Sequence, residues 1–175
     1  MSAKLSIITI TYQAEKFVER TIQSVISQGN RPEIEYIIID GASKDGTLAI
    51  VEKYRANIDI IVSEPDRGIY DAMNKGIQQA TGDYLIFMNA GDCFASNHTL
   101  DSLLEAINNQ PDVIVGDALF VDLQGKELGL RSEVTPHKIP ANLSWKSFQY
   151  GMVICHQSFI VKRSIAPLYD LTYRL

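Results

Sequence analysis

Apolar and polar positions alternate along the chain in segments whose length and period predict strands and helices in turn. Short runs rich in β-branched residues are typical of strands buried on both faces, and between them apolar residues recur at helical spacing. This alternation predicts an α/β fold with a mainly parallel open sheet, flanking helices and right-handed crossovers. The predicted strands span 5–11, 35–40, 58–63 and 84–88, and the predicted helices span 15–27, 48–55 and a segment that Asp66 would cap.

The helix after Asp66 carries an apolar stripe and a polar one, and we expect it to end at residues 81–83. Tyr70, Asp71 and Asn74 share one side of its N-terminal part, where the aligned peptide dipoles give a partial positive charge. Helix ends of this kind bind phosphate oxygens, so the polar stripe predicts a phosphate site. The apolar positions expected to face the core are Ile69, Ala72, Met73, Ile77 and Ala80.

Two carboxylates follow predicted strands directly, at the place where open α/β sheets bind ligands. Asp40 ends the second strand, where a carboxylate can accept hydrogen bonds from ribose or base donors. Asp92 closes a turn of small residues, 89–92, after the fourth strand, and such a turn suits a divalent cation bound to a diphosphate. Each residue taken alone has an ordinary interpretation as a cap or a turn residue. Their combination is what favours a binding site.

The loop after the first strand, Tyr12 to Glu15, contains no glycine. Dinucleotide-binding turns and phosphate loops of the G-x-x-x-x-G-K type need glycines for close backbone approach, so both are excluded. The same loop argues against a sugar nucleotidyltransferase. Cys93 and Cys155 lack metal-ligand spacing and are expected to be reduced thiols, which makes a zinc site improbable on chemical grounds.

Composition and charge narrow the class of protein further. The 175 residues, 46% apolar and 21% charged, are ordinary for one globular domain, and no apolar run approaches the roughly 18 residues of a membrane span. We therefore expect a cytoplasmic protein. Residues 1–120 hold 9 Lys and Arg against 17 Asp and Glu, a net −8, and residues 121–175 hold 7 against 4, a net +3. This balance suits a cation-dependent site and excludes a general nucleic-acid binder; the basic part could face an anionic acceptor or a lipid surface, or be a solvated face.

The later part of the chain gives weaker signals. A polar stretch that holds two prolines and has no clear period is expected to be a long functional loop or lid. His156 is open to two interpretations, a functional residue or an ordinary structural histidine. The expected elements are a helix over 100–108, a strand over 111–116, a hairpin turning at Gln124–Gly125, the loop over 132–150 and a strand over 155–161.

Four motifs in this order resemble the GT-A-fold inverting glycosyltransferases of family 2: S-I-I-T-I-T-Y, D-G-x-S-x-D-G-T, D-R-G-I-Y-D-A-M-N-K-G and N-A-G-D. The resemblance runs from Leu5 to about Asp92 and more weakly to Arg163. It implies a single GT-A domain, with a Rossmann-like nucleotide-sugar half over 1–92 and the start of an acceptor half over 93–175. The D-A-M-N-K-G, N-A-G-D and H-Q combination is most similar to the branch that builds colanic-acid-type and other surface polysaccharides.

The resemblance also implies an activity and a set of ligands. A sugar would pass from a nucleoside diphosphate, expected to be UDP, to a hydroxyl of a saccharide or lipid-linked acceptor, with Mg²⁺ or Mn²⁺ and with peripheral association at the inner face of the membrane. By position, the resemblance places Thr11, Tyr12 and Asp40 on the nucleoside, Asp66, Arg67, Gly68 and Asn74 along the nucleotide sugar, and Asn89, Ala90, Gly91 and Asp92 on ribose and metal, with Asp92 the metal ligand.

Three positions depart from the family's pattern. Asn89 and Gly91 stand where Asp is frequent, and Met73 stands where Arg is frequent, so Arg67 or Lys75 is expected to balance the phosphate charge. The family's catalytic carboxylate is expected beyond Leu175, with Asp170 a turn residue ahead of it. An alternative is therefore a nucleotide-sugar-binding module that lacks catalysis.

Overall fold

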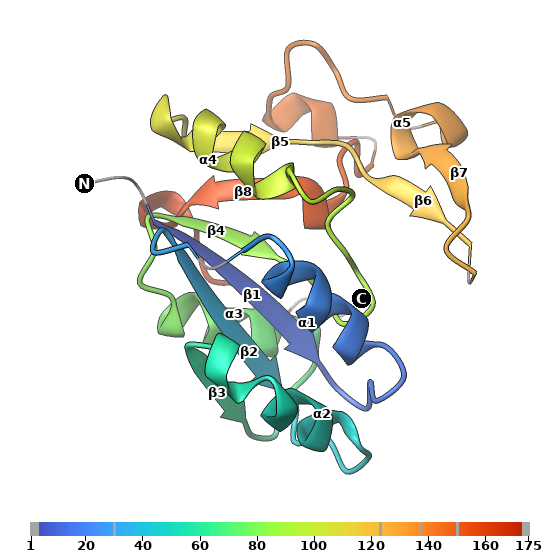
Figure 1. Cartoon of the computed structure of the whole chain (residues 1–175). Helices are drawn as coiled ribbons and strands as arrows, with labels where there is room; N and C mark the ends of the chain where they lie inside the picture. The colour runs from blue at the N-terminus through green and yellow to red at the C-terminus, as the bar shows by residue number, and fades with distance from the viewer. Residues whose placement is uncertain (1–3, 30, 123, 137, 150, 173–175) are drawn as a thin grey trace.

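The computed structural model describes residues 4–29, 31–122, 124–136, 138–149 and 151–172. Within them, a six-stranded sheet of order β3-β2-β1-β4-β8-β5 forms the centre, and a separate pair, β6-β7, lies beside it (Figure 1). β1 to β4 are mutually parallel, and β8 runs antiparallel to both β4 and β5. The strands are β1 (Leu5–Thr11), β2 (Ile34–Asp40), β3 (Ile60–Ser63), β4 (Tyr84–Phe87), β5 (Val113–Val115), β6 (Leu119–Val121), β7 (Glu127–Leu130) and β8 (Phe159–Lys162). The α-helices are α1 (Val18–Ile26), α2 (Thr47–Lys53), α3 (Ile69–Gln79), α4 (Thr99–Asn108) and α5 (Arg131–Val134), and the 3₁₀ turns are η1 (Arg55–Asn57), η2 (Trp145–Phe148), η3 (His156–Ser158) and η4 (Arg163–Ile165).

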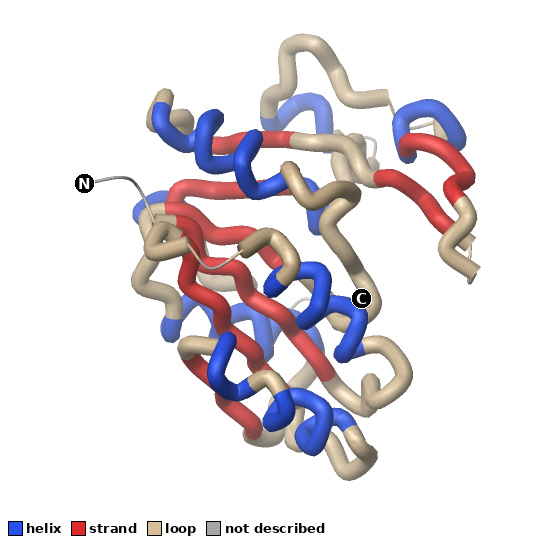
Figure 2. The backbone as a smooth tube through the Cα atoms, viewed as in Figure 1, coloured by secondary structure: helices blue, strands red, loops and turns tan. Residues whose placement is uncertain are grey.

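The sheet is covered on both faces, which explains its uniformly apolar strands. Every residue of β1 is buried, and successive side chains point to opposite faces. Leu5 and Ile7 belong to the core shared with α1, α2 and α4, whereas Ile8 and Ile10 belong to the core shared with α3. Figures 1 and 2 show α1 and α2 in front of the sheet and α3 behind it. The predicted α/β architecture is confirmed.

Element boundaries differ from the expectation at helix starts and strand starts. The expected helix from residue 15 begins at Val18, and the expected strand from Cys155 begins at Phe159, because the 3₁₀ turn η3 precedes it. Asp66 as the helix cap is wrong. Gly68 holds the N-cap position, with φ of 114°, and its N–H donates to Asp66 Oδ1 at 2.8 Å. The helix therefore starts later than expected, at Ile69, and this residue is 42% exposed and does not lie in the core as expected.

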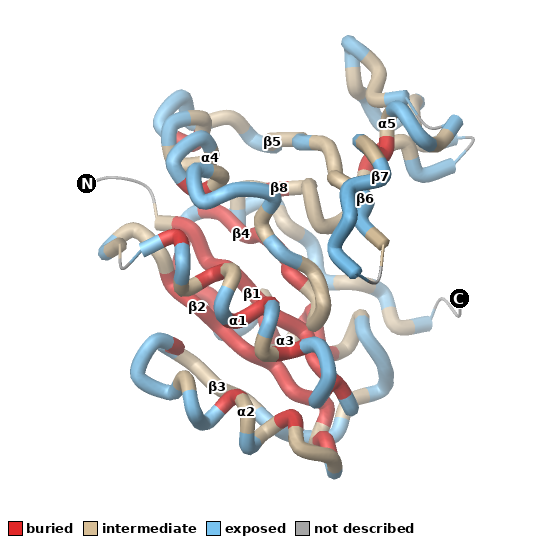
Figure 3. Tube along the Cα trace, turned by 45° about the vertical axis from the view of Figure 1, so that its right-hand side comes forward, coloured by how far each residue is buried: buried red, intermediate tan, exposed pale blue. Residues whose placement is uncertain are grey.

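A small lobe made of β6, β7 and α5 stands apart from the sheet and is largely exposed (Figure 3). The predicted hairpin turn is confirmed, since Gly125 adopts φ of 82° and donates to the Asp122 carbonyl at 2.9 Å. The expected loop over 132–150 is mostly irregular, although it opens within α5 and contains η2; residues 137 and 150 lie outside the described residues. Buried Arg131 donates to the carbonyls of Met152 and Val153, which ties the lobe to the chain before β8.

A buried carboxylate closes the sheet at the amino-terminal ends of its strands. Glu35 on β2 accepts hydrogen bonds from Ser6 Oγ at 2.5 Å, from Thr81 N at 2.8 Å and from Thr81 Oγ1 at 2.6 Å, and it pairs with Lys4 Nζ at 3.3 Å. Burial alone would raise the pKa of Glu35, but these hydrogen bonds outweigh it and lower the pKa to about 2. Glu35 thus joins β1, β2 and the loop before β4.

Replacing Glu35 by Gln should lower the free energy of unfolding at pH 7 by about 3–4 kcal/mol, because the pKa falls from 4.5 to about 2 and each pKa unit corresponds to about 1.4 kcal/mol. Since the folded-state pKa lies below the ordinary value of 4.5, the stabilisation is fully present above that pH and is lost as the pH falls toward 2. Urea denaturation at pH 7 and pH 3.5 should show the difference between parent and variant shrinking at the lower pH. Exposed Glu52→Gln is the control, and a pH-independent difference would contradict the assignment.

Gly76 lets α3 lie close against the sheet. A Cβ there would come 2.5 Å from Cγ2 of Ile8, a fully buried side chain of the central strand. Gly76→Ala should therefore destabilise the fold by about 1–3 kcal/mol through overpacking, even though alanine is the better helix former by about 1 kcal/mol. Thermal unfolding measures this, with exposed Gln78→Ala as the control in the same helix. A variant as stable as the parent would show that α3 can shift without loss.

Candidate functional site

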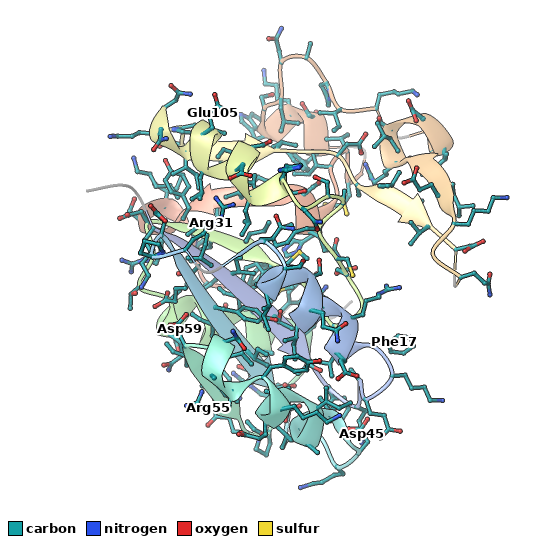
Figure 4. The ribbon with its side chains drawn as sticks, in the orientation of Figure 1. Phe17, Arg31, Asp45, Arg55, Asp59 and Glu105 are labelled. Atoms are coloured by element: carbon teal, nitrogen blue, oxygen red, sulfur yellow. The ribbon has the colours of Figure 1, made fainter. Side chains whose placement is uncertain are left out.

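Four loops meet at the carboxyl ends of the parallel strands. They follow β1, β2, β3 and β4, and because parallel strands end at the same edge of a sheet, the loops lie side by side. Figure 4 labels Phe17 and Asp45 in loops at this edge, and Arg31 and Asp59 toward the other end of the sheet. The structure thus gathers at one edge nearly all of the residues predicted from the sequence: Thr11, Tyr12, Asp40, Asp66, Arg67, Gly68, Asn89, Ala90, Gly91 and Asp92.

The loops after β1 and β2 are fastened to each other by side-chain-to-backbone hydrogen bonds in both directions. Ala14 N donates to Thr47 Oγ1 at 2.8 Å, and Glu15 N donates to Asp45 Oδ2 at 3.1 Å. In return, Gly46 N donates to Glu15 Oε2 at 2.7 Å. These bonds satisfy backbone groups that a loop would otherwise leave to water, so the two loops form one rigid unit.

Asp40 is enclosed by its own loop. The side chain is fully buried, and its carboxylate accepts hydrogen bonds from Ser43 N at 2.9 Å, from Ser63 Oγ at 2.7 Å and from Ser43 Oγ. The carboxylate therefore orders the turn after β2 and joins it to the end of β3. Direct contact between Asp40 and a bound molecule stays a prediction.

Tyr12, Gly41 and Asp66 bring three loops into contact. A Cβ on Gly41 would lie 2.6 Å from Asp66 Oδ2 and 3.1 Å from Tyr12 Cδ2, so any larger residue at this crossing would displace one of these side chains. The Tyr12 ring is 64% exposed, and the Arg67 side chain is 74% exposed. The edge therefore presents an open aromatic face beside a carboxylate and a cation.

The acidic turn after β4 is anchored on α1. Asp92 N donates to the Asn89 carbonyl at 2.9 Å, and Asn89 N donates to Asp92 Oδ2 at 3.2 Å, which closes the turn. Gly91, with φ of 110°, donates to Thr21 Oγ1 at 2.8 Å and accepts at its carbonyl from the Arg20 guanidinium. Helix α1 thus fixes the position of the Asp92 carboxylate.

Unsatisfied oxygen atoms mark the same edge. The Asp92 carboxyl lies at this edge, and burial raises its pKa. Hydrogen bonds from Gln157 and from the Asn89 N–H, and the charge of Arg20, only partly offset that rise. Among the described residues, two buried side-chain oxygens lack a hydrogen-bond partner, Thr11 Oγ1 and Asn89 Oδ1, and both lie at the ends of neighbouring strands. Buried polar atoms are nearly always paired, so these two are suited to a bound group.

The polar stripe of α3 faces a different neighbour from the one expected. Asn74 is 8% exposed, and its amide bonds to both backbone groups of Tyr169, whose ring stacks on Tyr70. Asp71 accepts from Arg67 N at 3.0 Å. The side chains of the stripe are therefore occupied within the chain, and a phosphate site at this end of the helix stays a prediction. A contact of Asn74 with a ligand stays a prediction.

The two cations expected to balance phosphate charge differ in their availability. Lys75 Nζ donates to the Pro65 carbonyl at 2.7 Å and pairs with Glu64 Oε1 at 3.0 Å. Arg67 has only a long 3.5 Å contact with Asp71. Met73 is buried in the core against the sheet. Arg67 is thus the better placed of the two.

Sequence reasoning missed several residues that build the edge. Ser43 lies within D-G-x-S-x-D-G-T and Gln157 within H-Q, so their motifs carried a signal. Arg20 and Thr21 lie on a helix surface, where no local pattern marks a side chain that contacts residue 91. Within the described residues, no group of three or more His, Cys, Asp and Glu lies together to hold a metal unaided, and no helix is long and apolar enough to cross a membrane.

The chain matches the family model described as Glycosyl transferase family 2 over residues 6–166. It therefore belongs to glycosyl transferase family 2. A PGL/p-HBAD biosynthesis glycosyltransferase of Mycobacterium bovis is 31% identical over 152 residues, which cover 82% of this chain and 54% of that one. An uncharacterized glycosyltransferase of Mycobacterium tuberculosis is 38% identical over 109 residues, covering 62% and 42%. The chain spans about half the length of these curated relatives.

Solved structures confirm the GT-A fold. Staphylococcus aureus TarS 1-349 in complex with UDP-GlcNAc superposes with a TM-score of 0.67 at 23% identity, over 92% of this chain and 46% of that one. A mannosyltransferase from Pyrobaculum calidifontis in complex with GDP-Man and Mn²⁺ superposes with a TM-score of 0.56 at 24% identity, over 70% and 36%. The resemblance noted in the sequence motifs is thus correct for family and fold.

Proposed function

We propose that this chain holds the donor site of an inverting glycosyltransferase that transfers a sugar from a UDP-sugar to an acceptor hydroxyl. The observation that carries the proposal is the edge where Thr11 Oγ1 and Asn89 Oδ1 lie unpaired near the Asp92 carboxylate. Residues 1–92 supply this donor half, and residues 93–175 begin the acceptor half.

The nucleoside is assigned to the loops after β1 and β2. The exposed Tyr12 ring offers a face for base stacking, and the ordered turn after Asp40 offers backbone groups to the base or ribose. Uridine is favoured because TarS, which is 28% identical over 64% of this chain, was solved in complex with UDP. The unpaired oxygen of Thr11 can accept from a donor of the nucleoside.

The diphosphate and its cation are assigned to the acidic turn and to α3. Mg²⁺ and Mn²⁺ are held by oxygen ligands, and Mg²⁺ is commonly bound by one or two carboxylates together with substrate phosphates. One half-buried carboxylate, Asp92, and the free oxygen of Asn89 fit that demand. The cation, when bound, would neutralise charge on the departing diphosphate. Arg67 and the N-terminus of α3 at Gly68 add positive potential on the other side.

The reaction that we assign to this site is direct in-line displacement with inversion, which is the chemistry that the motif resemblance implies. The chain's part is to hold the diphosphate, to keep the nucleoside fixed on rigid loops and so to orient the sugar toward the acceptor. The names of its relatives point to saccharide or lipid-linked acceptors of the cell surface, since one acts in PGL/p-HBAD biosynthesis and TarS on poly(ribitol-phosphate). We therefore place the reaction in surface polysaccharide or glycolipid biosynthesis, on the cytoplasmic side of the membrane.

Asp92→Asn should abolish the gain in UDP affinity that Mn²⁺ gives the parent, because the amide keeps the shape but loses the charge that binds the cation. The affinity for the cation should fall at least about tenfold, because changing a residue that only hydrogen-bonds to a metal ligand already costs that much. Calorimetric titration of UDP with and without Mn²⁺ measures it. Asp112→Asn, an exposed carboxylate before β5, is the control. If Mn²⁺ raised the UDP affinity of parent and variant equally, the assignment of Asp92 as the metal ligand would be wrong.

Tyr12→Ala should weaken UDP binding about 5- to 150-fold, which corresponds to about 1–3 kcal/mol for one stacked base. Tyr12→Phe should keep most of the affinity, since the ring and not the hydroxyl carries the contact. Trp145→Ala, an exposed aromatic residue in η2, is the matched control and should bind as the parent does. Equal UDP affinities of the Tyr12→Ala and Trp145→Ala variants would show that the base does not stack on Tyr12.

A further inference from the structure

Tyr169 is fastened to α3 through the side chain of Asn74. Asn74 Nδ2 donates to the Tyr169 carbonyl at 2.9 Å, and Tyr169 N donates to Asn74 Oδ1 at 2.7 Å. A carboxamide presents one donor and one acceptor side by side, as a peptide group does, so the two bonds fix one register of the segment on the helix. Asparagine is a weak helix former, and its burial within α3 is explained by this pairing.

The Tyr169 side chain completes a cluster of rings from four parts of the chain. Its ring stacks on Tyr70 at a centroid distance of 4.9 Å and meets the edge of Phe87 at 6.5 Å. Its hydroxyl bonds to His156 Nε2 at 2.7 Å, and the His156 ring stacks on Phe87 at 5.7 Å. The cluster therefore joins α3, the end of β4 and the turn before β8.

Each member of this cluster is a near neighbour of a residue assigned to the donor. Tyr70 follows Gly68 by two positions, and Phe87 precedes Asn89 by two. His156 adjoins Gln157, whose side chain bonds to Asp92. The Tyr169 contacts thus hold both the start of α3 and the acidic turn.

We propose that Asn74 and Tyr169 form a latch that positions the donor site, and that Asn74 acts on the donor through Tyr169 and not as a ligand. Asn74 and Tyr169 are positioning residues in this scheme, which rests on the proposed function. The latch fixes the first turns of α3 against the end of β4, and so sets the distance between the Asp66–Gly68 turn and the Asp92 turn. The diphosphate would span those two turns.

The test uses the full 175-residue chain with Asn74→Leu, Tyr169→Ala, the double variant and Tyr169→Phe. Leu168→Ala, a half-exposed neighbour in the same segment, is the matched control. UDP affinity with Mn²⁺ is measured by calorimetry, and amide hydrogen exchange is followed over α3. We expect Asn74→Leu and Tyr169→Ala each to weaken UDP binding about 2- to 30-fold, the usual size of coupling through packed contacts, and to speed exchange at residues 69–74.

Non-additivity separates a latch from a ligand. Tyr169→Ala keeps the two backbone groups that Asn74 binds and removes only the ring. If Asn74 acts by placing that ring, the double variant binds UDP no more weakly than the weaker single variant. Tyr169→Phe keeps the stacking and loses only the hydrogen bond to His156, so it should retain most of the affinity, and Leu168→Ala should behave as the parent. Losses that add, or unchanged exchange in α3 after Tyr169→Ala, would overturn the latch.

Two further comparisons keep the outcome decisive. If Asn74→Leu does not fold, Asn74→Asp serves instead, since its carboxylate accepts from Tyr169 N but repels the Tyr169 carbonyl. If the parent binds no UDP, the proposed function fails. The latch is still supported in that case if amide exchange at residues 69–74 is faster than in the parent and equally fast in the single and double variants. If the parent binds UDP and the variants match it in both readouts, the latch fails and the proposed function stands.

Discussion

The burial of β1 on both faces is the constraint from which the rest of the structure follows. Its alternating side chains must meet one helical layer in front and another behind, so a shift of one residue would exchange the two cores. That fixed register pairs Thr11 with Asp40 and Asp40 with Ser63. The carboxyl ends of β1, β2 and β3 are therefore aligned, and the loops that follow these strands contact one another without a bound ligand.

The same constraint decides which polar groups remain available. The loops use most of their side chains to satisfy one another, as Glu15, Asp45 and Thr47 do, and Asp40 is consumed in ordering its own turn. Few groups remain available: the exposed side chains of Tyr12 and Arg67, and the two buried oxygens of Thr11 and Asn89 that lack a hydrogen-bond partner. A rigid loop frame with few unpaired groups is the expected form of a preorganised binding site, because little order has to be gained on binding.

The sequence predicted those features that depend on local period and residue type. The limits of β1 and the turn over 89–92 agree with the structure, because buried strands and turns of small residues leave a clear pattern. The prediction of Asp66 as the helix N-cap is wrong because an aspartate two residues before a glycine N-cap has the same sequence pattern as a capping aspartate. The pairing of Asn74 with Tyr169, 95 positions apart, and the anchor of Gly91 on Arg20 have no local signature. Periodicity identifies a helical face but not the segment that covers it.

The neutral residue at position 89 has an electrostatic consequence for the proposed chemistry. With Asn89 in place of a second carboxylate, the turn offers a cation a single negative charge, and that charge is half-buried and already bonded to Gln157. One carboxylate binds a hard divalent ion weakly in competition with water, so tight binding of the cation would depend on the phosphate oxygens of the diphosphate as well. Cation and nucleotide would then each raise the affinity of the other by the same factor, because coupling between two bound species is reciprocal. A cation held in this way by Asp92 and the diphosphate would leave together with the nucleotide, which would tie cation release to product release.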